Sequence, residues 1–107
     1  DRPEADQAIG LEKTSAKMQM LRAGNACIEL WEYSNPFPAS KDPNYSPANH
    51  GWAHIALQVT DIFYEYERLT KAGMTFHRPP VTNVGEGRSA AIYGRDPFGN
   101  IVELYEP

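Results

Sequence analysis

The sequence predicts an α+β fold built from two βαβββ units, of which the first is incomplete. Two observations lead to this expectation. From Trp52 onward the hydrophobic pattern reads as a strand, a helix and then three strands. Upstream, residues 24–32 repeat residues 99–106: with one position skipped, both read Gly-Asn, an apolar pair, Glu, Leu, an aromatic residue and Glu. A duplicated β-hairpin explains this repeat economically.

The repeat and the prolines divide the 107 residues into three stretches of a single domain. Residues 1–32 are expected to be the tail of the first unit and residues 51–107 a complete second unit. Between them, residues 33–50 contain four prolines. Proline lacks a backbone donor and fixes φ, so this stretch is predicted to be an extended linker.

The composition excludes several classes of function. Ten Lys and Arg against 14 Asp and Glu give a net charge of −4, without the basic excess of a nucleic-acid-binding protein. No apolar stretch approaches the ~18 residues of a membrane span, and the acidic, polar start is unlike a signal peptide. Cys27 is the one cysteine, so no internal disulfide can form. This fits a reducing compartment, and we expect a cytoplasmic protein.

The first stretch predicts one hairpin. Residues 1–17 show no periodicity that indicates a helix or a strand. Residues 18–22 and 27–31 read as two strands, joined by a tight turn over 23–25. Gly and Asn in that turn tolerate the positive φ that short hairpin turns need.

The second unit is expected to hold one helix, capped by Asp61 at its start and ended by Gly73. Its expected buried stripe contains Ile62, Tyr66 and Leu69, with Phe63 as a further candidate. The other predicted segments are strands over 52–59, 74–77, 89–94 and 101–105, a flexible rim loop over 81–88 and a turn over 96–99.

Side-chain alternation places Glu29, His54 and Glu103 on the sheet face opposite the aliphatic residues that pack under the helix. An unpaired carboxylate is costly to bury. Two carboxylates that converge on one imidazole repel each other unless a cation or a proton lies between them. A divalent metal is the simplest resolution.

Two segments resemble the vicinal oxygen chelate superfamily, which includes glyoxalase I, methylmalonyl-CoA epimerase, extradiol dioxygenases, and the fosfomycin and bleomycin resistance proteins. One is WAHIAL at 52–57, followed by VTD at the start of the helix; the other is YGRDPFGNIVEL at 93–104. The resemblance covers residues 18–106. It implies paired βαβββ units whose glyoxalase-like mixed sheet curls around a metal.

The resemblance also implies a ligand set. By position, His54 and Glu103 match the first-strand and fourth-strand ligands of the second unit, and Glu29 matches the fourth-strand ligand of the first. The usual fourth ligand, a histidine on the first strand of the first unit, has no counterpart here; we expect that strand and its helix to be missing from this sequence, so that an upstream strand, another chain or water would supply the ligand. We expect one divalent metal: Ni, Co, Mn, Fe or Zn.

Three functions follow from these expectations. The first is a metal-dependent lyase or isomerase of glyoxalase or epimerase type, in which Glu103 or Glu29 moves a proton next to a chelated carbonyl. The second is an iron-dependent ring-cleaving dioxygenase. Such an iron site needs two histidines and one carboxylate. His54 is the one histidine in register on the predicted strands. The third is a metal-free drug-binding or metabolite-binding protein of bleomycin-resistance type, with a pocket lined by Trp31, Trp52 and Tyr105.

Other residues receive smaller roles. Trp31 and Tyr105 occupy equivalent places in the repeat and are candidates for the core or for contact with a small-molecule substrate, as is Tyr93. Arg95 is expected to form an ion pair with Asp96 or Glu106. The incomplete first unit leaves an open sheet edge, so we expect a homodimer, in which strand exchange between chains is one way to cover it.

Overall fold

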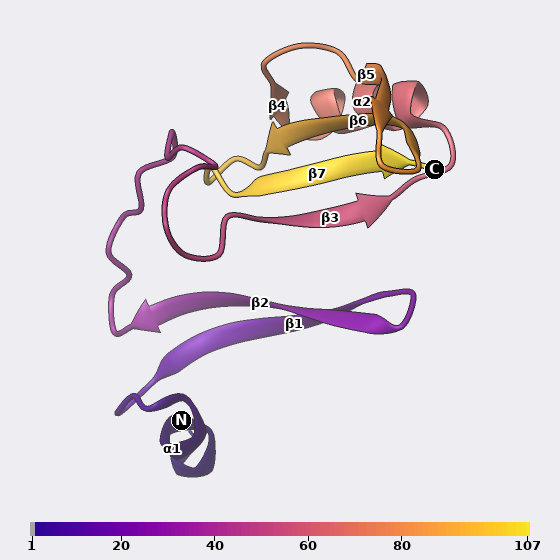
Figure 1. Cartoon of the computed structure of the whole chain (residues 1–107). Coiled ribbons are helices and arrows are strands. Elements are labelled where there is room, and N and C mark those ends of the chain that lie inside the picture. The colour runs from indigo at the N-terminus through magenta and orange to yellow at the C-terminus, as the bar shows by residue number, and fades with distance from the viewer. Residues whose placement is uncertain (1) are drawn as a thin grey trace. The chain divides into compact units, whose positions relative to one another are not determined.

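The computed structural model describes residues 2–107 and divides the chain into two compact units, Asp1–Ser40 and Lys41–Pro107. The chain contains two helices and seven strands over its described residues (Figure 1).

The first unit consists of helix α1 (Pro3–Ile9) and an antiparallel hairpin of β1 (Ser15–Ala23) and β2 (Ala26–Asn35). The predicted hairpin and its turn are present. Helix α1 and the start of β1 lie before Met18, where the sequence shows no periodicity that indicates a helix or a strand. Pro3 opens the helix and Gly10, with φ 74°, ends it. This proline-to-glycine pattern is typical of a short helix that is too brief to show a hydrophobic period.

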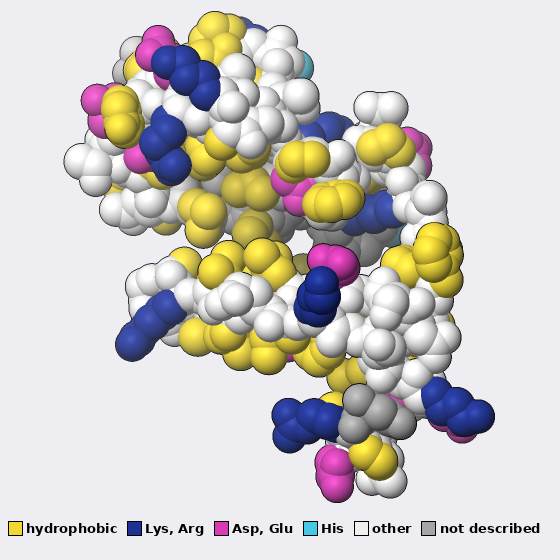
Figure 2. Space-filling model, turned by 180° about the vertical axis from the view of Figure 1, so that it is seen from behind, with side chains coloured by type: hydrophobic (Ala, Val, Ile, Leu, Met, Phe, Trp, Pro, Cys, Tyr) yellow, Lys and Arg dark blue, Asp and Glu magenta, His cyan; other side chains and the backbone are white. Residues whose placement is uncertain are grey.

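The hairpin carries hydrophobic side chains that are exposed (Figure 2). Its register places Met18 opposite Trp31 on one face and Gln19 opposite Leu30 on the other. The exposed hydrophobic residues of the hairpin are Met18, Met20, Leu21, Leu30 and Trp31. A two-stranded sheet of this kind is marginally stable in water without a further packing partner.

The second unit has a mixed sheet of five strands. In chain order its elements are β3 (His54–Gln58), α2 (Ile62–Ala72), β4 (Thr75–Phe76), β5 (Val81–Gly85), β6 (Arg88–Arg95) and β7 (Ile101–Glu106). The sheet order is β3-β7-β6-β4, and β5 also pairs with β6. β3 runs parallel to β7, and the other pairs are antiparallel. The α+β class and the mixed sheet agree with the prediction.

The prediction of a flexible loop over residues 81–88 is wrong. Residues 81–85 form β5, and a short turn at Glu86 and Gly87 leads into β6. Val81 pairs with Ala91 and Thr82 with Ala90, after which the register shifts. Val and Thr favour a strand, and the ladder hydrogen bonds to β6 override the glycines that suggested a loop.

Helix α2 covers one face of this sheet (Figure 1). Asp61 caps it by accepting from the Tyr64 backbone N–H, and Gly73 ends it with φ 114°. The core lies between α2 and the sheet and consists of Ile62, Ala90, Ile92 and Leu104, with Val59, Leu69 and Phe76 packed against it. Alternation along β6 and β7 therefore leaves Tyr93 and Glu103 on the opposite face.

Within the second unit, Tyr45 and Arg95 tie residues 41–53 to the end of the sheet. The Tyr45 hydroxyl donates to the Ala53 carbonyl at 2.9 Å and accepts from the Ile101 backbone N–H at 3.2 Å. The Arg95 guanidinium donates to the carbonyls of Tyr45 and Gly99 at 2.7 and 3.1 Å. The expected ion pair of Arg95 is thus replaced by bonds to backbone carbonyls, which hold the linker in place.

Neither helix of residues 2–107 has the length and apolar content needed to cross a membrane.

Candidate functional site

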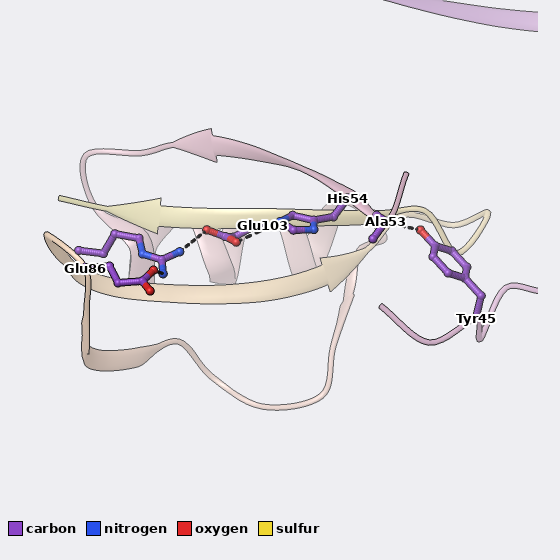
Figure 3. Close-up of polar contacts among 6 residues, drawn as sticks. Tyr45, Ala53, His54, Glu86 and Glu103 are labelled. Carbon is purple, nitrogen blue, oxygen red and sulfur yellow. Dashed lines mark hydrogen bonds and ion pairs between the residues drawn. The ribbon is translucent and has the colours of Figure 1, made fainter. Parts of the chain in front are cut away.

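The site is centred on Glu103 of β7, on the sheet face away from α2. His54 begins the adjacent parallel strand β3, and its Nε2 lies 3.3 Å from Glu103 Oε1. Figure 3 shows the imidazole of His54 directed along the sheet toward the Glu103 carboxylate. The Glu103 side chain is 6% exposed and that of His54 is 29% exposed. The structure thus brings together two of the three residues expected to act as metal ligands.

Arg88 contacts the other oxygen of Glu103. Its guanidinium donates to Glu103 Oε2 at 3.0 Å and, through its second terminal nitrogen, to Glu86 Oε2 at 2.8 Å. A buried carboxylate needs such compensation, because an isolated buried charge is strongly unfavourable. Part of the neutralisation that the sequence assigned to a metal therefore comes from this chain.

Sequence reasoning missed Arg88 for two reasons. It falls at the end of a stretch that reads as a loop, and strict alternation along β6 would group it with the core residues Ala90 and Ile92. The available signal was indirect: a buried Glu103 requires a cation, and arginine is a common source of one.

Tyr93 completes the cluster from β6. It pairs with Glu103 across the antiparallel β6–β7 ladder, and its ring centroid lies 4.4 Å from that of His54. Burial raises the pKa of the Tyr93 hydroxyl above 10.0, and the negative charge of Glu103 raises it further, while Arg88 acts in the opposite direction. At neutral pH this phenol is therefore a hydrogen-bond donor rather than a base.

Glu29 and Trp31 lie on β2 in the first unit. The Trp31 indole N–H donates to Glu29 Oε2 at 3.0 Å, and the indole stacks on Tyr33 with ring centroids 5.6 Å apart. The shared face of Glu29 and Trp31 agrees with the sequence pattern. Within each unit, taken by itself, the described residues contain no group of three or more His, Cys, Asp or Glu side chains arranged to hold a metal. The three-residue ligand set stays a prediction.

Two further residues, Tyr105 and Trp52, are predicted from the sequence to contact a small molecule. The Tyr105 hydroxyl lies 3.4 Å from Gln58 Oε1, its partner across the β3–β7 ladder, on the same sheet face as Glu103. Trp52 is fully exposed and is not among the residues that line the cavity beside Tyr93.

A cavity of about 410 Å³ adjoins the cluster at Tyr93. It lies within the second unit, between the linker and the end of the sheet at β4. Its lining residues are Asn44, Pro47, Thr75, Phe76, His77, Tyr93, Gly94, Arg95 and Ile101. Tyr93 thus belongs both to the charged cluster and to the wall of a cavity large enough for a small molecule.

The geometry of His54 and Glu103 fits two neighbouring ligands of one divalent metal. Metal–nitrogen and metal–oxygen bonds of about 2.0–2.2 Å place adjacent ligand atoms roughly 3 Å apart, close to the observed 3.3 Å. An imidazole nitrogen together with a carboxylate oxygen suits all five expected metals. One oxygen of Glu103 would serve as the ligand while Arg88 holds the other.

Comparison with known proteins gives a consistent result. A family model described as the Glyoxalase/Bleomycin resistance protein/Dioxygenase superfamily matches residues 4–104. A glyoxalase family protein from Bacillus cereus superposes with a TM-score of 0.83 at 23% identity, over 96% of this chain and 69% of that one. A glyoxalase family protein from Enterococcus faecalis gives 0.61 at 26% identity, over 98% of this chain and 71% of that one.

A third structure is a member of the glyoxalase/bleomycin resistance protein/dioxygenase superfamily from Sphaerobacter thermophilus. It gives a TM-score of 0.54 at 21% identity, over 100% of this chain and 89% of that one. No curated protein matches the chain significantly. The structural likeness at these identities concerns the fold.

Proposed function

The chain belongs to the Glyoxalase/Bleomycin resistance protein/Dioxygenase superfamily, and on that premise we propose that it is a metal-dependent lyase or isomerase that moves a proton next to a carbonyl group. The observation that carries the proposal is the 3.3 Å approach of His54 Nε2 to the buried Glu103 carboxylate. His54 and Glu103 would hold the metal, with Glu29 as a third ligand or as the proton carrier. When bound, the metal stabilises negative charge on two adjacent substrate oxygens.

Glu103, Glu29 and Tyr93 have separate roles in this proposal. Glu103 uses one carboxylate oxygen toward His54 and the other toward Arg88. Glu29 accepts from Trp31 through Oε2, and its Oε1 makes no hydrogen bond among residues 2–107. We propose the ligand role for Glu103 and, as the superfamily resemblance implies for one of the two glutamates, proton transfer for Glu29. The protonated Tyr93 would donate a hydrogen bond to a substrate oxygen that gains negative charge.

Proton exchange in D₂O tests the activity directly. Two probes cover the two reaction types: the hemithioacetal of methylglyoxal and glutathione, and a thioester that bears a hydrogen between two carbonyl groups. We expect metal-loaded protein to exchange the proton next to the carbonyl of one probe, as followed by NMR. Glu29→Gln is expected to retain metal and lose at least about 100-fold in exchange rate, since general acid–base groups contribute 10²–10⁴-fold. Full activity in both Glu29→Gln and Glu103→Gln would remove these carboxylates from the mechanism.

One observation favours a second candidate, a metal-free binding protein of bleomycin-resistance type. Arg88 neutralises Glu103, which lowers the cost of keeping this carboxylate inside without a metal. The cavity beside Tyr93 would then hold the ligand. Stoichiometric binding of an aromatic compound to chelator-treated protein, with no proton exchange on either probe, would favour this candidate over the first.

A further inference from the structure

Arg88 connects two carboxylates that differ sharply in exposure. One terminal nitrogen of its guanidinium lies 3.0 Å from Glu103, whose side chain is 6% exposed. The other lies 2.8 Å from Glu86, whose side chain is 82% exposed. Arg88 itself is 30% exposed, so solvent reaches it from the side of Glu86.

The two carboxylates differ in how readily another anion can replace them on Arg88. Separation of Glu103 from Arg88 would leave a buried carboxylate without its cationic partner, which is strongly unfavourable. In the Glu86 pair the carboxylate side chain is 82% exposed and the Arg88 side chain 30%, and an ion pair open to solvent in this way contributes little to stability. Glu86 also lies in the tight turn between β5 and β6, where its φ of 57° is unusual for a residue other than glycine. Arg88 thus has one fixed partner and one exchangeable partner.

We propose that Arg88 is an anion-binding residue of the site, and that the carboxylate of a small carbonyl substrate replaces Glu86 on its outer nitrogen. The inference rests on the proposed function, because it specifies the substrate class of that same site. Glu86 shows that a carboxylate fits at this position. The planar guanidinium pairs well with carboxylates, and the attraction strengthens where water is partly excluded.

The position of Arg88 links this anion to the reaction centre. The guanidinium contacts Glu103, which in turn contacts His54. A carboxylate on the outer nitrogen is therefore separated from the His54–Glu103 pair by one guanidinium group. We place a carbonyl one or two bonds away from that carboxylate on the side of Arg88 that faces Glu103. Compounds with a carboxylate next to or near the carbonyl, such as 2-oxo acids, meet this requirement.

Pyruvate and methyl pyruvate provide a matched pair of probes, because the ester replaces the charged carboxylate with a neutral group. Binding of each is measured by NMR titration of the full chain in the presence of a chelator, so that no metal contributes. Wild-type protein is expected to prefer pyruvate. Glu86→Gln removes the internal competitor and is expected to tighten pyruvate binding by about two- to five-fold, the range set by an exposed ion pair, without a change for methyl pyruvate. Arg88→Met is expected to abolish the preference.

The surface pair Glu65 and Arg68 on α2 supplies the control, since Glu65→Gln removes the same charge from an ion pair outside the site. Equal binding of the two probes to wild-type protein, or an equal effect of Glu86→Gln and Glu65→Gln, would overturn the proposal. If Arg88→Met fails to fold, the Glu86→Gln variant still tests the proposal, because the Glu86 side chain is 82% exposed. Because the titration is free of metal and turnover, loss of proton exchange with intact pyruvate preference would reject the proposed function and leave the anion site standing.

Discussion

The rings of His54 on β3 and Tyr93 on β6 lie with their centroids 4.4 Å apart, although β7 separates their strands in the sheet. Glu103 of β7 contacts His54 and is the cross-strand partner of Tyr93. Three neighbouring strands therefore contribute to a single cluster, and β6 supplies both Arg88 and Tyr93. The arrangement explains why burial and the Glu103 charge together raise the pKa of Tyr93.

The ionisation of Tyr93 is the first prediction. Titration followed by tyrosinate absorbance should show one of the six tyrosines ionising above the ordinary pKa of 10.0. In Tyr93→Phe this late step should disappear. Since the folded-state pKa is raised, the stability linked to this group is fully present below pH 10 and is lost as the pH rises through the folded-state pKa. Identical titrations of the two proteins would contradict the assignment.

The ion pair of Arg88 with Glu103 supplies the second prediction. Arg88→Met should lower the free energy of unfolding by about 2–3 kcal/mol, somewhat less than for a fully buried pair, because it leaves the Glu103 charge uncompensated. The double variant Arg88→Met/Glu103→Leu should recover part of the loss. Glu86→Gln is the matched control and should change stability by less than about 1 kcal/mol. Urea unfolding measures all three, and equal effects of Arg88→Met and Glu86→Gln would show that Glu103 needs no partner.

Gly99 gives a prediction about the linker. It has φ 88°, and a Cβ there would lie 2.4 Å from backbone atoms of Pro43. Gly85 has a nearly equal φ of 87° but open space around it. Gly99→Ala should therefore destabilise the second unit more than Gly85→Ala, by about 1–3 kcal/mol beyond the shared backbone strain. Thermal unfolding of both variants checks this, and equal losses would mean that residues near Pro43 do not pack on the sheet end.

The exposed hairpin β1–β2 underlies a prediction of oligomeric state. Its sheet has two strands, and Met18, Met20, Leu30 and Trp31 are all more than a third exposed. We expect a homodimer in which these side chains are covered. Light scattering over a range of concentrations should give twice the mass of the chain, and Met20→Lys should shift the protein toward monomer. A monomer at every concentration would count against the dimer.

The parts of the fold that follow a simple period could be predicted from the sequence. Alternation along β3 and β7 placed His54 and Glu103 on one face, and Asp61 and Gly73 marked the ends of α2 correctly. Both signals are local, so they survive without knowledge of the partner strands. The family resemblance is confirmed by the match over residues 4–104.

The parts that depend on pairing could not be predicted. β5 exists because β6 supplies its ladder, although its own residues suggest a loop. Arg88 reaches Glu103 from the end of that turn, and Arg95 binds carbonyls of a linker far away in the sequence. In each case the deciding interaction is nonlocal, and residue type alone leaves several partners open.

The most direct test of the account is the binding of a divalent metal to His54 and Glu103. Metal-stripped protein would be titrated with Zn²⁺ or Mn²⁺, and the bound metal counted by mass spectrometry after dialysis. We predict one metal per site in the wild-type protein and at least a ten-fold loss of affinity in His54→Ala and in Glu103→Gln, with Glu65→Gln unchanged. Affinities that are equal in all four proteins, or no binding in the wild type, would contradict the central claim.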